Sequence, residues 1–236
     1  SRGTIIQYII KNGKGSINNV SGLAAGVNYL ANATFGGIPS FGASNATDYF
    51  NVTKAQSLIE IYKINNVAYG EAVRVMFNVT DVANVTYVVQ KRDGTPVVPE
   101  TVVLNLNATD NVIVLALGAG NYTITITGAG NENYTRDVFA APFTVYKGDL
   151  AVGVAAENIT PLDNGKVNIT SIPSDFVGNV SIVVDGVTVY NGTPASSIDI
   201  GRFSVGNKTA KVTCYGDDNY AVRTVDANCT VNKAVS

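Results

Sequence analysis

Apolar and polar residues alternate in short runs along most of the chain. The segments "VRVMFNVT" (73–80), "NYTITIT" (121–127) and "GKVNITSI" (165–172) place an apolar residue at nearly every second position. A period of two is typical of a β-strand with one buried and one exposed face. The phase predicts that three asparagines, Asn78, Asn121 and Asn168, are exposed. It predicts buried side chains at Phe77, Val79, Tyr122, Ile124, Val167, Ile169 and Val212.

Turn signals separate these runs at short intervals. The segments "TYVVQKRDG" (86–94) and "SIVVDG" (181–186) both end in Asp-Gly, which favours a tight turn. About seven strands in about 90 residues, with a turn every 8–12 residues or so, is the pattern of an immunoglobulin-like (Ig-like) sandwich. We therefore expect an all-β fold built of antiparallel Ig-like β-sandwiches.

The chain also repeats itself. The segments 37–54, 130–147 and 216–233 align without a gap, and each begins with Gly, has an aromatic residue at its fifth position and ends in Lys. A repeat of this length predicts tandem domains. We expect a first unit at 1–54, a partial Ig-like domain that lacks its first strands, a second unit at 55–147 and a third unit at 148–233. Residues 234–236 are then the start of a next unit or a tail.

A tyrosine recurs at one structurally informative place. Tyr122 in "LGAGNYTI" and Tyr29 in "LAAGVNYL" stand at the start of the sixth strand of their units. A tyrosine there whose hydroxyl bonds back to nearby backbone is the tyrosine corner of Ig-like sandwiches. The third unit has Lys208 at the aligned place, so we expect its corner to be missing or replaced.

The repeated string resembles that of a known kind of protein. The pattern G-N-Y-T-[IV]-T, followed by G-[DN]-x-N-Y and F-T-V, is similar to the tandem Ig-like repeats of large archaeal and bacterial adhesin-like cell-surface proteins. The resemblance covers nearly the whole chain. It implies no particular activity by itself, because Ig-like folds have many uses.

Composition excludes several classes of function. The chain has no histidine, only two cysteines, 14% charged residues and a net charge of −2. These values leave no Ser-His-Asp or Cys-His site, no zinc site of four thiolates and no basic face for nucleic acid. The longest apolar run, "VIVLAL" at 112–117, is far shorter than the roughly 20 residues that span a bilayer. We expect no enzyme, no cofactor, no metal and no membrane span in this segment.

Asparagine lies unusually often in the N-glycosylation pattern N-x-[ST]. Part of this excess follows from a composition rich in Asn and Thr, but the strand phase directs several of these asparagines outward. We expect glycans on several sites, among which Asn191 is the weakest because Pro194 follows its Thr193. The candidate acceptors are Asn19, Asn32, Asn45, Asn51, Asn78, Asn84, Asn107, Asn121, Asn133, Asn158, Asn168, Asn179, Asn191, Asn207 and Asn228.

The first predicted strand of the first unit is apolar on both faces. This favours a partner on each face or along the edge of the strand. Two explanations stay open: the segment belongs to a longer array, or a strand from another subunit completes the first unit. The residues that would take part in such an assembly are Ile5, Ile6, Tyr8, Ile9 and Ile10.

Two further features receive a structural interpretation. Cys214 and Cys229 fall on inward positions too far apart for a disulfide, so we expect two buried thiols. "GDDN" (216–219) has oxygen ligands for calcium, but the aligned loops are not acidic, so we expect a turn.

Together these features predict the glycosylated stalk of an adhesin-like protein at the cell surface. The first alternative is a subunit of a surface filament, pilus or surface layer assembled by strand complementation. A carbohydrate-binding module is an alternative of another class. The expected partners are neighbouring Ig-like domains or identical subunits, and a host-cell or envelope surface.

Overall fold

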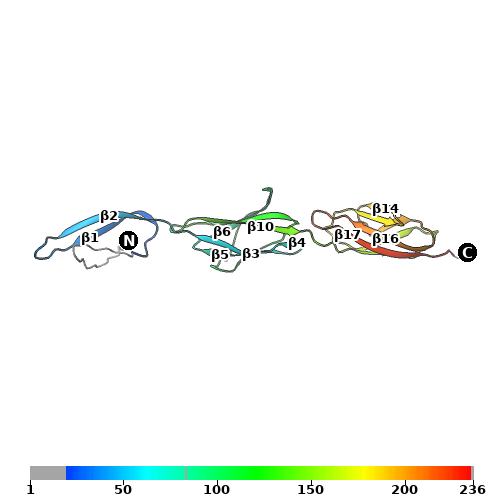
Figure 1. The fold of residues 1–236 in the computed structure, drawn as a ribbon, viewed down its shortest axis with the longest axis horizontal. Helices are drawn as coiled ribbons and strands as arrows, with labels where there is room; N and C mark the ends of the chain where they lie inside the picture. Colours follow the sequence, from blue (N-terminus) through cyan, green and yellow to red (C-terminus); the bar gives the residue numbers. More distant parts are fainter. Residues whose placement is uncertain (1–19, 83, 235–236) are drawn as a thin grey trace.

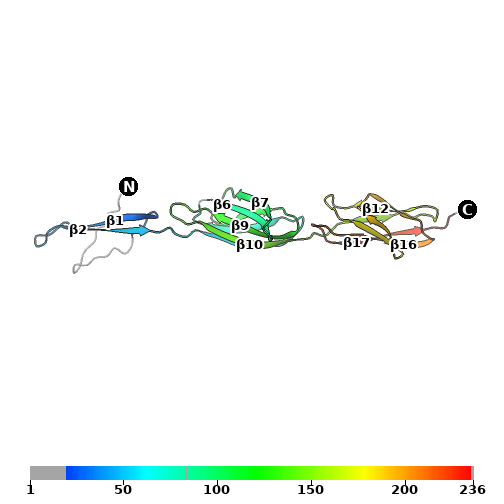
Figure 2. The ribbon, with the colours of Figure 1, turned by 90° about the horizontal axis from the view of Figure 1, so that it is seen from above.

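The computed structural model describes residues 20–82 and 84–234. The molecule is elongated, and its three units follow one another along the long axis (Figures 1 and 2). Strands β1 to β17 lie in the described residues, and no helix does. The predicted all-β, antiparallel Ig-like fold is confirmed. Residues 5–10, for which we predicted an assembly strand, lie outside the described residues.

Two sheets face each other in the second unit. One has the order β3-β5-β8 and the other β4-β10-β9-β6-β7, and all pairs are antiparallel except β4 with β10. β5 pairs with β8 and β6 pairs with β9, so some neighbouring strands are not consecutive in the chain, as expected for a sandwich. The strands are β3 (Leu58–Ile64), β4 (Val67–Ala68), β5 (Val73–Thr80), β6 (Val85–Lys91), β7 (Pro96–Val102), β8 (Asn111–Leu115), β9 (Gly120–Gly128) and β10 (Asp137–Tyr146).

The third unit has nearly the same arrangement. Its sheets have the orders β11-β12-β15 and β14-β13-β16-β17. A parallel bridge between Ile159 and Val231 takes the place of the β4–β10 pairing. The strands are β11 (Gly153–Ala156), β12 (Gly165–Ser171), β13 (Val180–Val184), β14 (Val187–Gly192), β15 (Ser197–Gly201), β16 (Gly206–Cys214) and β17 (Arg223–Val231).

The second and third units each have a hydrophobic core of their own. Residues from Ile59 to Val145 form one cluster and residues from Leu150 to Ala227 form the other. All seven positions that the strand phase placed inside are buried. Each buried Val, Leu, Ile or Phe contributes about 1.5–3 kcal/mol. These side chains therefore hold the paired sheets together.

The predicted exposure of the three asparagines is only partly right. Asn121 is exposed, but Asn78 and Asn168 are half-buried. Their strands β5 and β12 are the central strands of three-stranded sheets, so each asparagine is flanked on two sides. Asn78 lies beside Glu60 and accepts the Asp110 N–H at 3.1 Å, and Asn168 lies between Ala155 and Ser197. Alternation along one strand gives the face on which a side chain lies, but not the position of that strand in the sheet.

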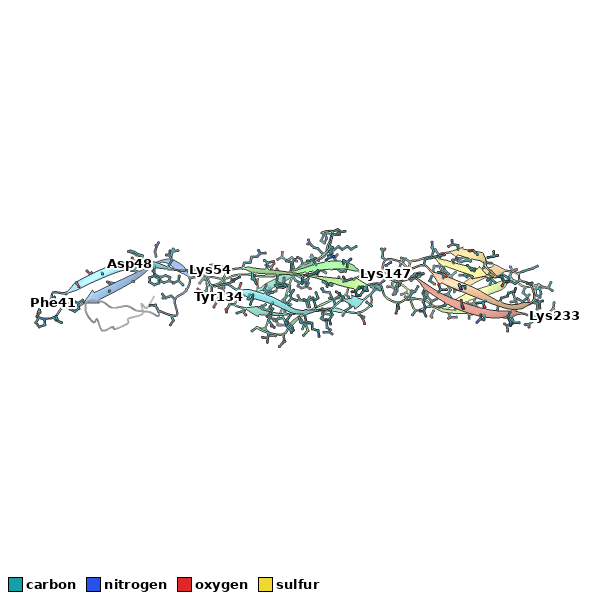
Figure 3. All side chains as sticks on the ribbon, in the orientation of Figure 1. Phe41, Asp48, Lys54, Tyr134, Lys147 and Lys233 are labelled. Atoms are coloured by element: carbon teal, nitrogen blue, oxygen red, sulfur yellow. The ribbon has the colours of Figure 1, made fainter. Side chains whose placement is uncertain are left out.

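The described part of the first unit is a two-stranded hairpin of β1 (Gly26–Phe35) and β2 (Ser44–Val52), which align with β9 and β10. Tyr29 stacks on Phe50 with ring centroids 5.6 Å apart, as Tyr122 stacks on Phe143 at 5.4 Å. Asp48, labelled in Figure 3, is exposed and stands where the second unit has the buried Ala141. The hairpin thus keeps the aromatic pair but has a more polar face.

Candidate functional site

The tyrosine corners fix the backbone that leads into β1 and β9. The Tyr122 hydroxyl donates to the Gly118 carbonyl at 2.7 Å, and the Tyr29 hydroxyl donates to the Ala24 carbonyl at 3.0 Å. The tyrosine of the first unit reaches one residue further back, because β1 has a bulge between Gly26 and Tyr29. Both predicted corners are confirmed, and each fixes the loop at the end of its unit.

A lysine replaces the corner in the third unit. Lys208 lies 2.6 Å from the carboxylate of Asp185 and donates to the Ser204 hydroxyl at 3.3 Å. Ser204 aligns with Gly118, so the ammonium group reaches the same loop as the tyrosine hydroxyl does in the second unit. The tyrosine corner of the third unit, which we expected to be missing or replaced, is therefore replaced by a lysine.

Four hydrogen bonds to one loop fix the junction between the first and second units. Two come from the first unit, and two come from Ala55, the first residue of the second unit. Lys54 Nζ donates to the Asn131 carbonyl at 2.7 Å, and the Ala25 N–H donates to Asn133 Oδ1 at 2.9 Å. Ala55, which follows the lysine, exchanges backbone bonds of 2.9 Å with the Asn133 carbonyl and with the Thr135 N–H. The end of one unit is thereby held against the loop at residues 130–134 of the next (Figure 3).

The junction between the second and third units repeats the same four bonds. Lys147 Nζ donates to the Asp217 carbonyl, and the Ala119 N–H donates to Asn219 Oδ1 at 3.0 Å. The Gly148 N–H donates to the Asn219 carbonyl at 2.8 Å, and the Ala221 N–H donates to the Gly148 carbonyl at 3.0 Å. The repeat in the sequence is therefore also a repeat of the contact between units.

The loop that receives these bonds has its own internal support. Asn131 Oδ1 accepts the N–H groups of Asn133 and Tyr134 at 2.8 and 2.9 Å, and Asp217 Oδ1 accepts the equivalent two at 2.8 Å each. The other carboxylate oxygen of Asp217 accepts the Val177 N–H at 2.9 Å. Because both carboxylate oxygens are engaged in backbone bonds, "GDDN" has the structure of a turn.

Among the residues that the structure describes, one contact is present at the second junction and not at the first. The hydroxyls of Tyr69 and Tyr220 donate to the two oxygens of Asp175 at 2.7 and 2.9 Å, and the tyrosine rings pack edge to face at 5.3 Å. Tyr69 belongs to the second unit, and the other two residues belong to the third. Sequence reasoning missed this cluster. The only signal was an insertion in the third unit, between the segments that resemble β5 and β6, which supplies Asp175.

The same cluster changes the ionisation of its members. Desolvation and the hydrogen bond to Asp175 raise the pKa of Tyr220 to about 12. The hydrogen bond to Asp175 and desolvation raise the pKa of Tyr69. The two tyrosine hydroxyls hold the pKa of Asp175 below its ordinary value. The cluster therefore favours one state, with two protonated phenols around one carboxylate.

Fourteen of the fifteen glycosylation candidates lie in the described residues, and Asn19 lies outside them. None of the fourteen is buried, and all except Asn78 and Asn168 are exposed. Asn207 and Asn228 lie on adjacent strands, and the Thr of each N-x-[ST] pattern donates its hydroxyl to the Asn of the other, at 3.0 and 2.7 Å. Exposure is a requirement for glycosylation, but occupancy stays a prediction.

The two cysteines are buried and not bonded to each other. Cys214 pairs with Arg223 beside the β16–β17 turn, whereas Cys229 pairs with Lys208 further along the hairpin. Burial raises the pKa of both thiols, so they remain protonated and behave as small apolar core residues.

The described residues contain no group of three or more Cys, Asp and Glu side chains placed to hold a metal ion. Within the same part of the chain, no helix has the length and apolar character to cross a bilayer.

Comparisons with known proteins give a likeness in structure alone. No family model matches the chain, and no curated protein matches it. Many solved structures are similar, and three of them serve as examples. The fibronectin(III)-like modules of Clostridium thermocellum CbhA have 16% identity and a TM-score of 0.30 over 76% of this chain and 95% of that one. The BSP domain of a biofilm-associated protein has 18% identity and a TM-score of 0.28 over 76% and 30%.

The third is the three N-terminal domains of the highly immunogenic outer capsid protein of bacteriophage RB49, with 13% identity and a TM-score of 0.31 over 75% of this chain and 59% of that one. Likenesses at such TM-scores bear on neither the function nor the partners of this chain. The strand order described above defines its class, which is a tandem array of Ig-like sandwiches.

Proposed function

We propose that the chain is part of a glycosylated, extracellular stalk that holds a functional region of an adhesin-like protein away from a cell surface. The observation that carries this proposal is the repeated junction. At each one the same two bonds join one unit to the loop of the next, and the first residue of the next unit makes the same two backbone bonds to that loop. In a linear array each unit contacts only its neighbours, so the length of the array increases with every unit that is added. The very short connections at Lys54 and Lys147 favour a stiff rod over flexible beads.

The distribution of the glycosylation candidates supports the same proposal. They occur in all three units, on both strands and loops, and twelve of the fourteen described ones are exposed. Glycans at these sites would cover the sheet faces and protect the backbone from proteases, which is useful to a stalk outside the cell.

The alternative of a filament subunit has one observation in its favour. The described hairpin of the first unit exposes Val27 (74%), Leu30 (56%) and Tyr49 (65%). Leu30 and Tyr49 are cross-strand partners, and exposed apolar side chains favour contact with another chain.

Electron microscopy of the native protein distinguishes the two proposals. A stalk should give separate, nearly straight rods of uniform length anchored to the cell, and a filament subunit should give fibres of variable length. Fibres that persist after dilution of the purified native protein would contradict the stalk. Rods folded back on themselves at the unit junctions would contradict the role that we give to the repeated bonds.

A further inference from the structure

The far end of the third unit carries a third copy of the groups that make the junctions. Lys233 aligns with Lys54 and Lys147, and Val205 aligns with Ala119. Ala234 follows the lysine, as Gly148 does at the second junction. We call Val205, Lys233 and Ala234 the open-end surface. Figure 3 shows Lys233 beyond the last strand.

The open-end surface has donors without acceptors. Neither the Lys233 ammonium group nor the N–H of Val205 or Ala234 makes a hydrogen bond to any residue in the described part of the chain. All three residues are exposed. At both junctions the equivalent lysine and backbone N–H are bonded to the loop of the next unit. The residue after the lysine, which is the first residue of that unit, donates to the same loop. The surface therefore fits a partner with acceptors in the same arrangement.

The two receiving loops define what such a partner needs. The second loop residue is Asn131 or Asp217, and its side chain accepts the N–H groups within the loop. That arrangement leaves the carbonyl of the same residue to the incoming lysine. The fourth loop residue is Asn133 or Asn219, whose side-chain oxygen accepts the incoming backbone N–H. The required pattern is therefore Gly-(Asn or Asp)-x-Asn-Tyr.

The aligned loop of the first unit, residues 37–41, does not have this pattern. Ile38 and Phe41 exchange both of their backbone bonds at 2.9 Å, so the Ile38 carbonyl is engaged within the loop. Ser40 stands where the receiving loops have asparagine, and its hydroxyl lies on a shorter side chain. Ile38 and Phe41 are 56% and 68% exposed and make this tip apolar. It is a poor complement to a lysine and a backbone N–H.

Beside the open-end surface, one residue of the third unit differs from its equivalent at the second junction. Ser204 aligns with Gly118, where an added Cβ would lie 2.9 Å from Asn219 Oδ1. In the first unit the equivalent of Gly118 is Ala24, which precedes the donor Ala25 and has a Cβ. The first junction forms nevertheless. A Cβ at this position is thus compatible with the four bonds.

We propose that the open-end surface docks a further Ig-like unit through a Gly-(Asn or Asp)-x-Asn-Tyr loop, and that it does not dock the 37–41 tip of a second copy of this chain. The inference rests on the proposed stalk and identifies the next partner in the array. Assembly through this surface is therefore from unit to unit along one polypeptide, and not head to tail between identical subunits.

The first experiment supplies the missing acceptors. A second copy of residues 148–233 is joined directly after Lys233 of the full chain, so that the new connection has the same order, Lys then Gly, as the second junction. Amide hydrogen exchange is followed by NMR at Val205, with Ala119 as the internal reference. The expected result is exchange at Val205 at least about tenfold slower than in the unextended chain.

The matched control carries the equivalents of Asn219→Ser and Asp217→Ile in the added copy alone, which gives its loop the two key residues of the 37–41 tip. We expect Val205 to exchange as fast in this control as in the unextended chain. The amides of the added β13 and β16 report that the added copy is folded. The proposal would be overturned if the Val205 amide exchanged equally slowly in both extended chains. It would also be overturned if this amide exchanged as fast in both as in the unextended chain while the added copy is folded.

The second experiment uses the chain without extension. Sedimentation at increasing concentration should give a monomer, because the 37–41 tip is not the complement of the open-end surface. Oligomers that grow with concentration and disappear in Lys233→Ala would overturn the proposal. Failure of either experiment would overturn the docking proposal but not the proposed stalk, because connected units can form an extended rod without these bonds. The stalk is tested separately by microscopy of the native protein.

Discussion

Replacing Ile124 with alanine should destabilise the second unit and leave the third almost unchanged. Ile124 is completely buried on β9, between Ala141 of β10 and Val89 of β6. Strands on both sides limit the collapse of the cavity, so the loss of stability should be about 2–5 kcal/mol. In a unit of this size each kcal/mol lowers the melting temperature by roughly 4–8 °C, which gives a fall of roughly 8–40 °C.

Differential scanning calorimetry should resolve this change, because the two complete units have separate cores. The transition of the second unit should move down while that of the third stays in place. Ile182→Ala on β13, which is equally buried in the third unit, should produce the opposite pattern. Thr125→Ala, at the half-buried neighbour of Ile124 on the outer face, is the matched control and should change stability by less than about 1 kcal/mol.

Two results would refute this reasoning. If both transitions moved together in Ile124→Ala, the units would not fold independently, and the boundary at Lys147 would be wrong. If the loss of stability were below about 0.5 kcal/mol, the side chain would not occupy a packed site, and the strand phase would be wrong.

Three further predictions concern the second junction and the surface. Asp175→Ala removes the acceptor of Tyr69 and Tyr220, so small-angle scattering should show a shorter and broader distribution of lengths. Asp226→Ala, at an exposed position on β17, should not change it, and an unchanged distribution in both variants would contradict a stiffening role. The raised tyrosine pKa values mean that the cluster stabilises the junction fully below the ordinary value of 10.0 and loses this effect as pH rises toward about 12. Four tyrosines, Tyr62, Tyr69, Tyr122 and Tyr220, have a raised pKa, so ultraviolet absorbance should show a late phase of tyrosine ionisation. The part of this phase that belongs to Tyr69 and Tyr220 should move to lower pH in Asp175→Ala. The lowered pKa of Asp175 means that its contribution is present above 3.8 and is lost as pH falls through the lowered value. The part of the native-host protein that spans residues 1–236 should exceed the 24.7 kDa of the bare chain by whole glycans, and an equal mass for that part would reject glycosylation.

Much of the fold could be predicted because its signals are local. The period of two in β5, β9 and β12 gave the buried face correctly, since the pleat of a strand alone determines which side chains share a face. The corners at Tyr29 and Tyr122 were equally predictable, because their hydrogen bonds reach only four or five residues back along the chain.

The remaining features depend on contacts between distant segments. The half-burial of Asn78 follows from the central place of β5 in its sheet, and no single strand carries that information. Tyr69 meets Asp175 across 106 residues and between two units. The repeat indicated that Lys54 and Lys147 close their units, but the loops that accept their ammonium groups became evident only when the units were placed in line.

The two junctions therefore share four bonds but are not equal in stiffness. Small contacts between domains permit relative motion unless further contacts oppose it. The second junction has such a contact in the Tyr69, Asp175 and Tyr220 cluster. The first has none among the residues that the structure describes, and its Asn133 belongs to an N-x-[ST] pattern, whereas Asn219 does not. A glycan on the side-chain nitrogen of Asn133 would leave its oxygen available to Ala25. Bending along the array should thus concentrate at the first junction, where a glycan would shield the more mobile connection.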